Sequence, residues 1–305
     1  MQAAVSARDG SGDGHPAPTT IGGRSFRWGE RTFVMGVLNV TPDSFSQDGL
    51  LATDPADPMV RAVSLAKAMV EDGADLLDIG GESTRPGHTT LDAAAERARV
   101  VPVVAAVRAA LPTIPISIDT TKPDVAEAAL AAGADLLNDV WATAPDGDLA
   151  RVAAAHGVPL VLMHNRLEPR YTTLMPEILA DLQAAIQRAL GAGVHEDDLI
   201  VDPGFGFGKT PAQNVELLRN LAALRLLGRP ILLGTSRKST LGRILDLPVG
   251  ERLEATLATT ALSIASGVDL VRVHDVRANV RVARVSDAII RGTWSPGGAA
   301  SGGQP

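Results

Sequence analysis

The amino-acid sequence predicts a (β/α)8 barrel that follows a small N-terminal hairpin and carries a disordered tail at each end. Three observations predict this fold. Short β-branched runs alternate with Ala- and Leu-rich stretches of helical spacing, glycines follow the helical stretches, and polar residues follow the β-branched runs. Eight such strand-then-helix units occur along the chain, as a barrel of parallel strands requires. A doubly wound open sheet is the competing architecture, but fewer units normally satisfy it.

Each predicted strand is a short apolar run bounded by residues that interrupt strands, such as Gly, Pro, Asp and Asn. In chain order these strands cover residues 33–40, 75–79, 114–119, 135–138, 159–164, 199–202, 230–234 and 270–273. Each is followed by a stretch in which apolar residues recur with the spacing of one helix face. These predicted helices cover residues 57–72, 91–110, 123–132, 148–156, 176–192, 212–227, 251–266 and 276–291.

Glycine and proline mark the helix ends. Pro123 and Pro176 fit first-turn positions, where the missing N–H costs nothing. A glycine suited to a left-handed C-terminal position follows five of the helices: Gly73, Gly133, Gly157, Gly193 and Gly267. Before the first unit, residues 19–31 contain two glycine turns and predict a hairpin that plugs the lower end of the barrel. One domain, residues 19–292, therefore lies between Gly-, Ala- and Ser-rich tails at residues 1–18 and 293–305.

Composition excludes several classes of function. The formal net charge of −7 argues against a nucleic-acid or anionic-membrane partner, although a local cluster of Arg and Lys can still bind small anions. The absence of cysteine excludes disulfides, thiol catalysis and thiolate metal sites. No apolar run approaches the ~18 residues of a membrane span, and the N-terminus does not resemble a signal peptide. We therefore expect a cytoplasmic protein with no membrane partner.

Polar residues collect where the predicted strands end, which is where barrels of this type keep their active sites. One such residue alone is more often a loop residue or a helix cap, but all eight units show the pattern. The residues are Asn39, Glu82 to Arg85, Asp119, Asn138, Asp139, His164, Asp202, Ser236, Arg237, Lys238, His274 and Asp275. Their coincidence predicts a single site at this end of the barrel.

The residue types indicate the chemistry of that site. Asp119 and Asp202 have apolar neighbours, and buried carboxylates need hydrogen-bond donors, which a flat heterocycle with several N–H groups would supply. Asn138 offers both a donor and an acceptor. Cationic side chains at or next to these strand ends can bind anions: Arg85, Arg237, Lys238, Arg272 and His274. We therefore expect a site for one neutral ring rich in hydrogen-bonding groups, together with anionic groups.

The glycine-rich segment DPGFGFGKT at residues 202–210 looks like a phosphate-binding loop but does not fit one. A P-loop needs glycine where Pro203 stands, and the spacing also fails the Gly-x-Gly-x-x-Gly pattern of dinucleotide sites. A mobile glycine loop over the site is the better interpretation.

Seven motifs in order along the chain resemble the dihydropteroate synthase family. They are GVLNVTPDSFS (36–46), GGESTRPG (80–87), SIDT (117–120), LNDV (137–140), DPGFGFGK (202–209), GTSRKS (234–239) and RVHDV (272–276). The resemblance spans residues 33–291. It implies a transferase of folate biosynthesis and a target of sulfonamides. The implied reaction joins 6-hydroxymethyl-7,8-dihydropterin diphosphate to p-aminobenzoate, giving 7,8-dihydropteroate and diphosphate by a dissociative substitution.

The resemblance also implies roles for individual residues. The pterin ring would be held by Asp119, Asn138, Asp202, Lys238 and Phe207. The diphosphate would be bound by Asn39, Arg85, Arg272 and His274, with Mg²⁺ on Asn39 and Asp43. The p-aminobenzoate would contact Phe45, Thr84, Arg85, Pro86 and Ser236. Asp119, Lys238, Arg272 and His274 would carry the catalysis, and the protein would be a homodimer.

Two departures from the family pattern and two alternatives remain. Gln47-Asp48-Gly49-Leu50 replaces the usual Asp-Gly-Gly, and Asn165-Arg166 follows His164, so p-aminobenzoate affinity and sulfonamide sensitivity stay open.

A pterin-dependent methyltransferase would not need the STRPG and TSRKS motifs. A non-catalytic pterin-binding homologue would be expected to have lost part of them, and this chain has both.

Overall fold

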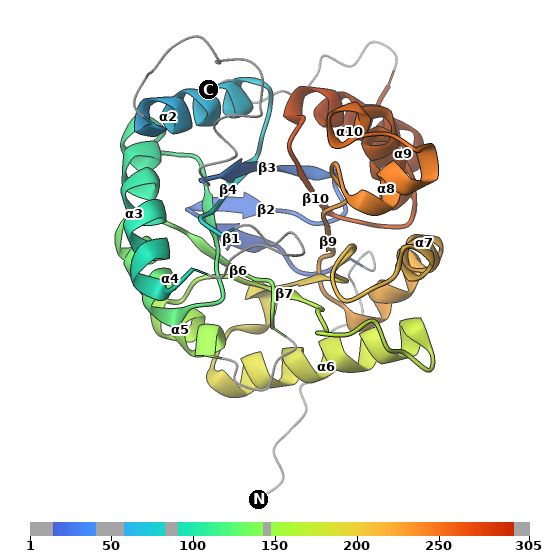
Figure 1. Cartoon of the computed structure of the whole chain (residues 1–305), viewed down its shortest axis with the longest axis horizontal. Coiled ribbons are helices and arrows are strands. Elements are labelled where there is room, and N and C mark those ends of the chain that lie inside the picture. Colours follow the sequence, from blue (N-terminus) through green and yellow to red (C-terminus); the bar gives the residue numbers. More distant parts are fainter. Residues whose placement is uncertain (1–14, 41–57, 83–90, 143–147, 296–305) are drawn as a thin grey trace, which may run out of the picture.

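A computed structural model describes residues 15–40, 58–82, 91–142 and 148–295 of the chain (Figure 1). Within this part, eight parallel strands form one sheet in the order β8-β7-β6-β5-β4-β3-β10-β9. A parallel bridge between Val201 and Ile231 joins the two ends of that order, and the amide of Val201 donates to the carbonyl of Pro230 at 2.9 Å. The sheet is therefore nearly closed into the predicted barrel, and the open-sheet alternative is wrong.

The described elements follow the predicted series. The strands are β1 (Thr19–Ile21), β2 (Arg24–Phe26), β3 (Phe33–Asn39), β4 (Leu76–Gly80), β5 (Ile116–Asp119), β6 (Leu136–Asp139), β7 (Leu160–Met163), β8 (Leu199–Asp202), β9 (Leu232–Leu233) and β10 (Leu270–Val273). The helices are α2 (Pro58–Glu71), α3 (Ala93–Ala110), α4 (Pro123–Ala131), α5 (Asp148–His156), α6 (Leu174–Ala192), α7 (Pro211–Arg219), α8 (Ser239–Leu245), α9 (Leu253–Ala265) and α10 (Val276–Ile290). Short 3-10 helices are η1 (Glu196–Asp198), η2 (Leu221–Leu227) and η3 (Val249–Glu251).

The predicted helix ends are confirmed. All five glycines proposed for C-terminal positions have positive φ, from 61° at Gly157 to 110° at Gly133, a conformation that glycine adopts without steric cost. Pro123 is the first residue of α4 and Pro176 lies in the first turn of α6.

Two details of the helix prediction are wrong. The predicted helix 212–227 is two elements, because the Asn220 side chain donates to the carbonyl of Glu216 at 2.8 Å and the backbone leaves the α conformation there. Leu221 and Leu224 are buried three residues apart, which matches the period of the 3-10 helix η2. The short helix α8, directly after Lys238, was not predicted.

The N-terminal hairpin closes the lower end of the barrel, as predicted. β1 and β2 pair antiparallel, and Ile21, Phe26 and Trp28 are buried in one cluster with residues of the barrel interior. The barrel residues of that cluster are Phe33, Met35, Leu76, Leu136, Val161, Ile200, Leu232 and Leu270. The hairpin thereby removes apolar barrel residues from water.

The helices surround the strands in Figure 1, and a second apolar cluster fills the layer between them. With the lower end plugged, the carboxyl ends of the strands are the end where a ligand can approach. None of the helices in the described residues is long and apolar enough to cross a membrane. Most of both predicted tails, residues 1–14 and 296–305, lies outside the described residues.

Candidate active site at the strand ends

An arginine on β10 bridges two carboxylates at the centre of the barrel. Arg272 Nε donates to Asp78 Oδ2 at 2.6 Å, and Arg272 Nη2 donates to Asp119 Oδ2 at 2.9 Å. Asp78 lies on β4 and Asp119 at the end of β5, so neighbouring strands hold the two carboxylates on one side of the arginine. The side chain of Asp78 is fully buried and that of Asp119 is 12% exposed. The two carboxylates and the guanidinium therefore depend on one another for their partners.

Asn138 joins this cluster from β6. Its register partner on β5 is Asp119, and its Nδ2 atom donates to Asp78 Oδ2 at 3.3 Å. The other oxygen of Asp78, Oδ1, is buried and has no hydrogen-bond partner among the described residues. Asp78 was not among the predicted site residues. Its position as a lone carboxylate inside the apolar strand LLDIG indicates a functional role, since a buried charge requires partners.

Asp202 and Lys238 form the other side of the cluster. Asp202 is buried at the end of β8 and accepts from the amide of Gly204 at 2.7 Å. Burial raises its pKa, and Lys238, Gly204, Lys209 and Arg272 oppose this rise. Burial lowers the pKa of Lys238 to about 8, and Asp202 opposes that shift. The two groups are therefore near enough to stabilise each other's charge.

The glycine-rich loop between β8 and α7 packs against Lys238. Lys238 Nζ donates to the carbonyl of Phe205 and lies 4.4 Å from the ring centroid of Phe207. Gly206, with φ of 84°, permits this approach, because a Cβ atom there would lie 2.8 Å from Lys238 Cδ. Phe207 is only half-buried, so its ring forms part of the edge of the site.

The acidity of Asp119 is strongly perturbed. Burial raises its pKa to about 7, against the attraction of Arg272, while Asp78, Glu96 and Asp139 add to the rise. A hydrogen-bond donor from a ligand would favour the ionised form. A carboxylate poised between two protonation states is typical of functional sites.

The segment after β9 meets the end of β10 at a second set of contacts. Ser236 Oγ lies 3.0 Å from His274 Nδ1 and accepts from the His274 amide at 3.2 Å. Arg237 donates to Asp275 through Nε at 3.1 Å and Nη2 at 2.7 Å. The guanidinium of Arg237, which was predicted to bind an anion, is thus partly neutralised by Asp275.

The structure brings most of the described site residues together. Asp119, Asn138, Asp202, Lys238 and Arg272 lie in one charged cluster with Asp78, and His274 and Ser236 contact each other beside it. Asn39 is the last residue of β3, level with Gly80 of β4. Five predicted residues lie outside the described part of the chain: Asp43, Phe45, Thr84, Arg85 and Pro86.

Fold and site together define the class of the molecule. The family model described as pterin binding enzyme matches residues 35–274, which span the barrel from β3 to the end of β10 and include every residue of the charged cluster. The molecule is thus a pterin-binding (β/α)8 barrel.

Comparison with known proteins narrows the class to one family. A dihydropteroate synthase of Clostridium beijerinckii is 50% identical over 272 residues, which cover 89% of this chain and 99% of the relative. The solved structure of a Clostridium difficile dihydropteroate synthase, determined in the presence of pteroic acid, is 47% identical with a TM-score of 0.82 and covers 87% of this chain and 99% of that one. A Xanthomonas albilineans dihydropteroate synthase solved with 4-aminobenzoic acid is 40% identical, with a TM-score of 0.83 and coverage of 90% and 98%. The chain belongs to the dihydropteroate synthase family.

Proposed function

We propose that this chain condenses 6-hydroxymethyl-7,8-dihydropterin diphosphate with p-aminobenzoate to give 7,8-dihydropteroate and diphosphate. The observation that carries the proposal is the buried cluster at the strand ends. In this cluster Arg272 bridges Asp78 and Asp119, and Asn138 donates to Asp78. Such a cluster offers acceptors and donors to a flat ring that has both. The relatives solved with pteroic acid and with 4-aminobenzoic acid support the same substrates.

The ring of the pterin would lie among Asp119, Asn138, Asp202 and Lys238, with Phe207 at its edge. Carboxylates at Asp119 and Asp202 accept from ring N–H groups, and these contacts strengthen as the departure of diphosphate leaves positive charge on the pterin. Contacts that are stronger in the transition state than in the ground state accelerate the reaction. These two carboxylates therefore contribute to turnover as well as to binding.

The leaving diphosphate would be stabilised by Arg272, His274 and Asn39, together with Arg85. Arg272 can form paired hydrogen bonds with phosphate oxygens. The amide oxygen of Asn39 suits Mg²⁺, because this ion usually takes one or two protein oxygens and completes its shell with substrate phosphates and water. Asn39 and Asp43 would hold Mg²⁺, which would neutralise charge on the leaving group when bound.

The p-aminobenzoate would approach from the side of Ser236, with Phe45, Thr84, Arg85 and Pro86 as its further contacts. Its arylamine is already unprotonated at neutral pH, so no strong general base is required. The protein's task is to align the amine with the pterin methylene, which replaces a bimolecular encounter by an oriented one.

The test is turnover of the full chain with the pterin diphosphate, p-aminobenzoate and Mg²⁺. We expect 7,8-dihydropteroate to form and diphosphate release to depend on p-aminobenzoate, with loss of both when Mg²⁺ is chelated. Tight pterin binding without product would contradict the proposal in favour of a non-catalytic homologue. Methyl transfer from a methylfolate would favour the methyltransferase, an alternative that the named relatives do not favour. Competition by a sulfonamide checks the p-aminobenzoate site.

The affinity for the pterin is expected to depend on pH through Asp119. Its pKa in the free protein is about 7, and only the carboxylate accepts from ring N–H groups. Protonation of Asp119 should therefore lower the affinity by up to about tenfold per unit as the pH falls below 7. Titration of 6-hydroxymethylpterin, which lacks the titrating diphosphate, measures this between pH 5.5 and 8.5. The Asp119→Asn protein is the control, and its affinity should fall less steeply below pH 7 than that of the parent.

We further propose a cytoplasmic homodimer. The dimer is supported by exposed aliphatic side chains on helices α9 and α10, which pack against each other. Leu262, Val285 and Ile289 are 69%, 61% and 74% exposed. Burial of such a surface against a second copy would be favourable. Sedimentation should give twice the chain mass of 31.6 kDa, and Leu262→Arg should shift the particle toward one chain, whereas Leu226→Arg, at another exposed leucine, should not.

A further inference from the structure

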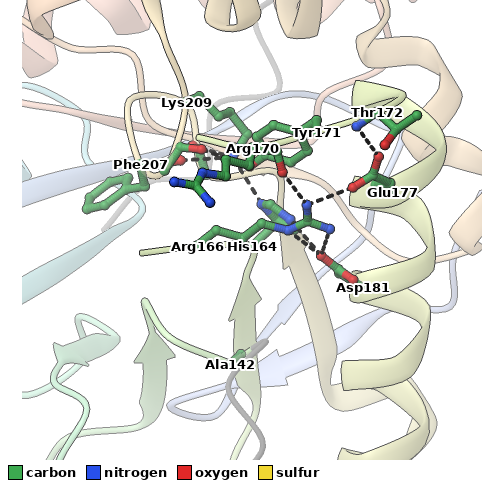
Figure 2. A network of polar contacts seen from close by, with 12 residues as sticks. Ala142, His164, Arg166, Arg170, Tyr171, Thr172, Glu177, Asp181, Phe207 and Lys209 are labelled. Carbon is green, nitrogen blue, oxygen red and sulfur yellow. Dashed lines mark hydrogen bonds and ion pairs between the residues drawn. The ribbon is translucent and has the colours of Figure 1, made fainter. Parts of the chain in front are cut away.

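Behind the glycine-rich loop lies a polar network that the proposed mechanism does not use (Figure 2). Its centre is Lys209, the last residue of the DPGFGFGK motif. Lys209 Nζ donates to the carbonyl of Gly204 at 3.0 Å and to that of Phe207 at 3.1 Å, and it lies 3.0 Å from His164 Nδ1. An ammonium group has three N–H donors, so these three acceptors use all of them.

The geometry fixes the protonation of His164. Its Nδ1 faces the ammonium group of Lys209, so this nitrogen accepts, and the ring proton is on Nε2, which lies 3.1 Å from Asp181 Oδ2. Burial, followed by the charge of Lys209, lowers the pKa of His164 to about 4, so the ring is neutral at physiological pH. Burial likewise lowers the pKa of Lys209 to about 7, which shows the desolvation that the three acceptors must offset.

Asp181 on α6 is fixed in turn by Arg166. Arg166 donates to Asp181 Oδ2 through Nε at 3.0 Å and Nη2 at 2.7 Å, and to Glu177 Oε2 through Nη1 at 2.7 Å. Lys209, His164, Asp181 and Arg166 therefore form a chain of alternating cation, neutral ring, anion and cation. The charge of Arg166 is thus paired with Glu177 and Asp181 on this side of the loop.

The opposite side of the same loop faces the active site. There, Lys238 Nζ donates to the carbonyl of Phe205 and lies over the ring of Phe207. Gly204, Gly206 and Gly208 have positive φ of 68°, 84° and 53°, and Tyr171 donates to the carbonyl of Gly208 at 2.8 Å. The side chains of Lys209, Lys238 and Tyr171 thus donate to the carbonyls of four of the five successive residues 204–208.

We propose that Lys209, with neutral His164 as its acceptor, is a positioning residue that sets Phe207 and, through the loop, Lys238 for the pterin. Lys209 acts from behind the loop and does not touch the ring. This inference rests on the proposed function, because it assigns Lys209 to the pterin side of the same site. Removal of its N–H donors would leave the carbonyls of Gly204 and Phe207 without these bonds, and the loop would sample other conformations.

Lys209→Met is the main test, with Lys209→Arg as the matched variant that keeps the charge and the donors. At pH 7 we expect Lys209→Met to weaken pterin binding and raise KM for the pterin diphosphate about tenfold, the effect of one charged hydrogen bond. Lys209→Arg should recover most of this loss. A merely structural role would lower Tm while the folded fraction kept the wild-type pterin Kd, and that result would overturn the proposal.

A second pair of variants separates the two nitrogens of His164. Asn places an amide near the position of Nδ1, where its oxygen can accept from Lys209, whereas Gln places an amide near Nε2, toward Asp181. We expect His164→Asn to keep pterin affinity within about threefold and His164→Gln to lose about as much as Lys209→Met. The reverse order, or equal affinities, would overturn the inference, and Lys209→Met decides the matter if a His164 variant does not fold. If the unaltered chain neither binds nor converts the pterin, the proposed function fails first.

Discussion

Asp119→Asn is expected to lower kcat/KM by about 10²- to 10³-fold, the usual effect of removing one preorganised group that stabilises developing charge. The amide cannot supply a full negative charge to the pterin as it becomes cationic. Steady-state turnover with saturating p-aminobenzoate measures this loss. Asp124→Asn, at an exposed position in the first turn of α4, is the matched control and should leave kcat/KM unchanged.

The same substitution should change stability little. Burial raises the pKa of Asp119 from 3.8 to about 7 in the folded protein. Between these two pKa values the folded state keeps a proton that the unfolded chain has released. The ionised carboxylate therefore costs stability, and this cost is absent below about pH 4, grows as the pH rises to about 7 and is complete above it. At pH 8 a neutral Asn should leave Tm equal or slightly higher, because Arg272 keeps its bond to Asp78. Equal losses of Tm and turnover would show that the carboxylate is mainly structural.

Arg272→Met is expected to destabilise the fold by about 3 kcal/mol or more at pH 8, since removal of one partner leaves buried carboxylates without their countercharge. Asp78 is fully buried and loses the Nε bond, and Asp119 loses the Nη2 bond. Equilibrium unfolding in urea measures the change. Arg277→Met is the control, because Arg277 also pairs with an aspartate, Asp72, but its side chain is 68% exposed, and such pairs contribute about 1 kcal/mol or less.

The loss on Arg272→Met should shrink in acid. Without the arginine, the folded-state pKa of Asp119 rises further above its unfolded value, so protonation of Asp119 relieves part of the cost as the pH falls toward about 4. A second substitution, Asp78→Asn, removes one of the two unpaired charges and should restore at least about 1 kcal/mol at pH 8. An Arg272→Met protein as stable as the parent at pH 8 would show that water, and not Arg272, satisfies these carboxylates.

The local pattern of the sequence was sufficient to predict the helices and strands and most of the residues of the site. Strands such as Leu199–Asp202 and Leu270–Val273 have the predicted bounds, because a short apolar run ending in a polar residue is a local signal. Helix ends at residues such as Gly133 and Gly193 were predictable because a positive φ is a property of one residue. The strand-end positions of Asp119, Asn138 and Asp202 followed from the same periodicity. The break at Asn220 was missed because a single side-chain bond to a nearby carbonyl decides it.

The sequence by itself determined that eight strands carry polar residues at one end of a barrel and which family that pattern belongs to. Only the tertiary structure decided how those residues pair. Asp78 and Arg272 are 194 positions apart in the chain, and Lys209 contacts His164 from 45 positions away. Such pairings follow from closure of the barrel, which brings strands distant in sequence to neighbouring positions, and the low dielectric inside then makes each buried charge depend on the partner that closure provides.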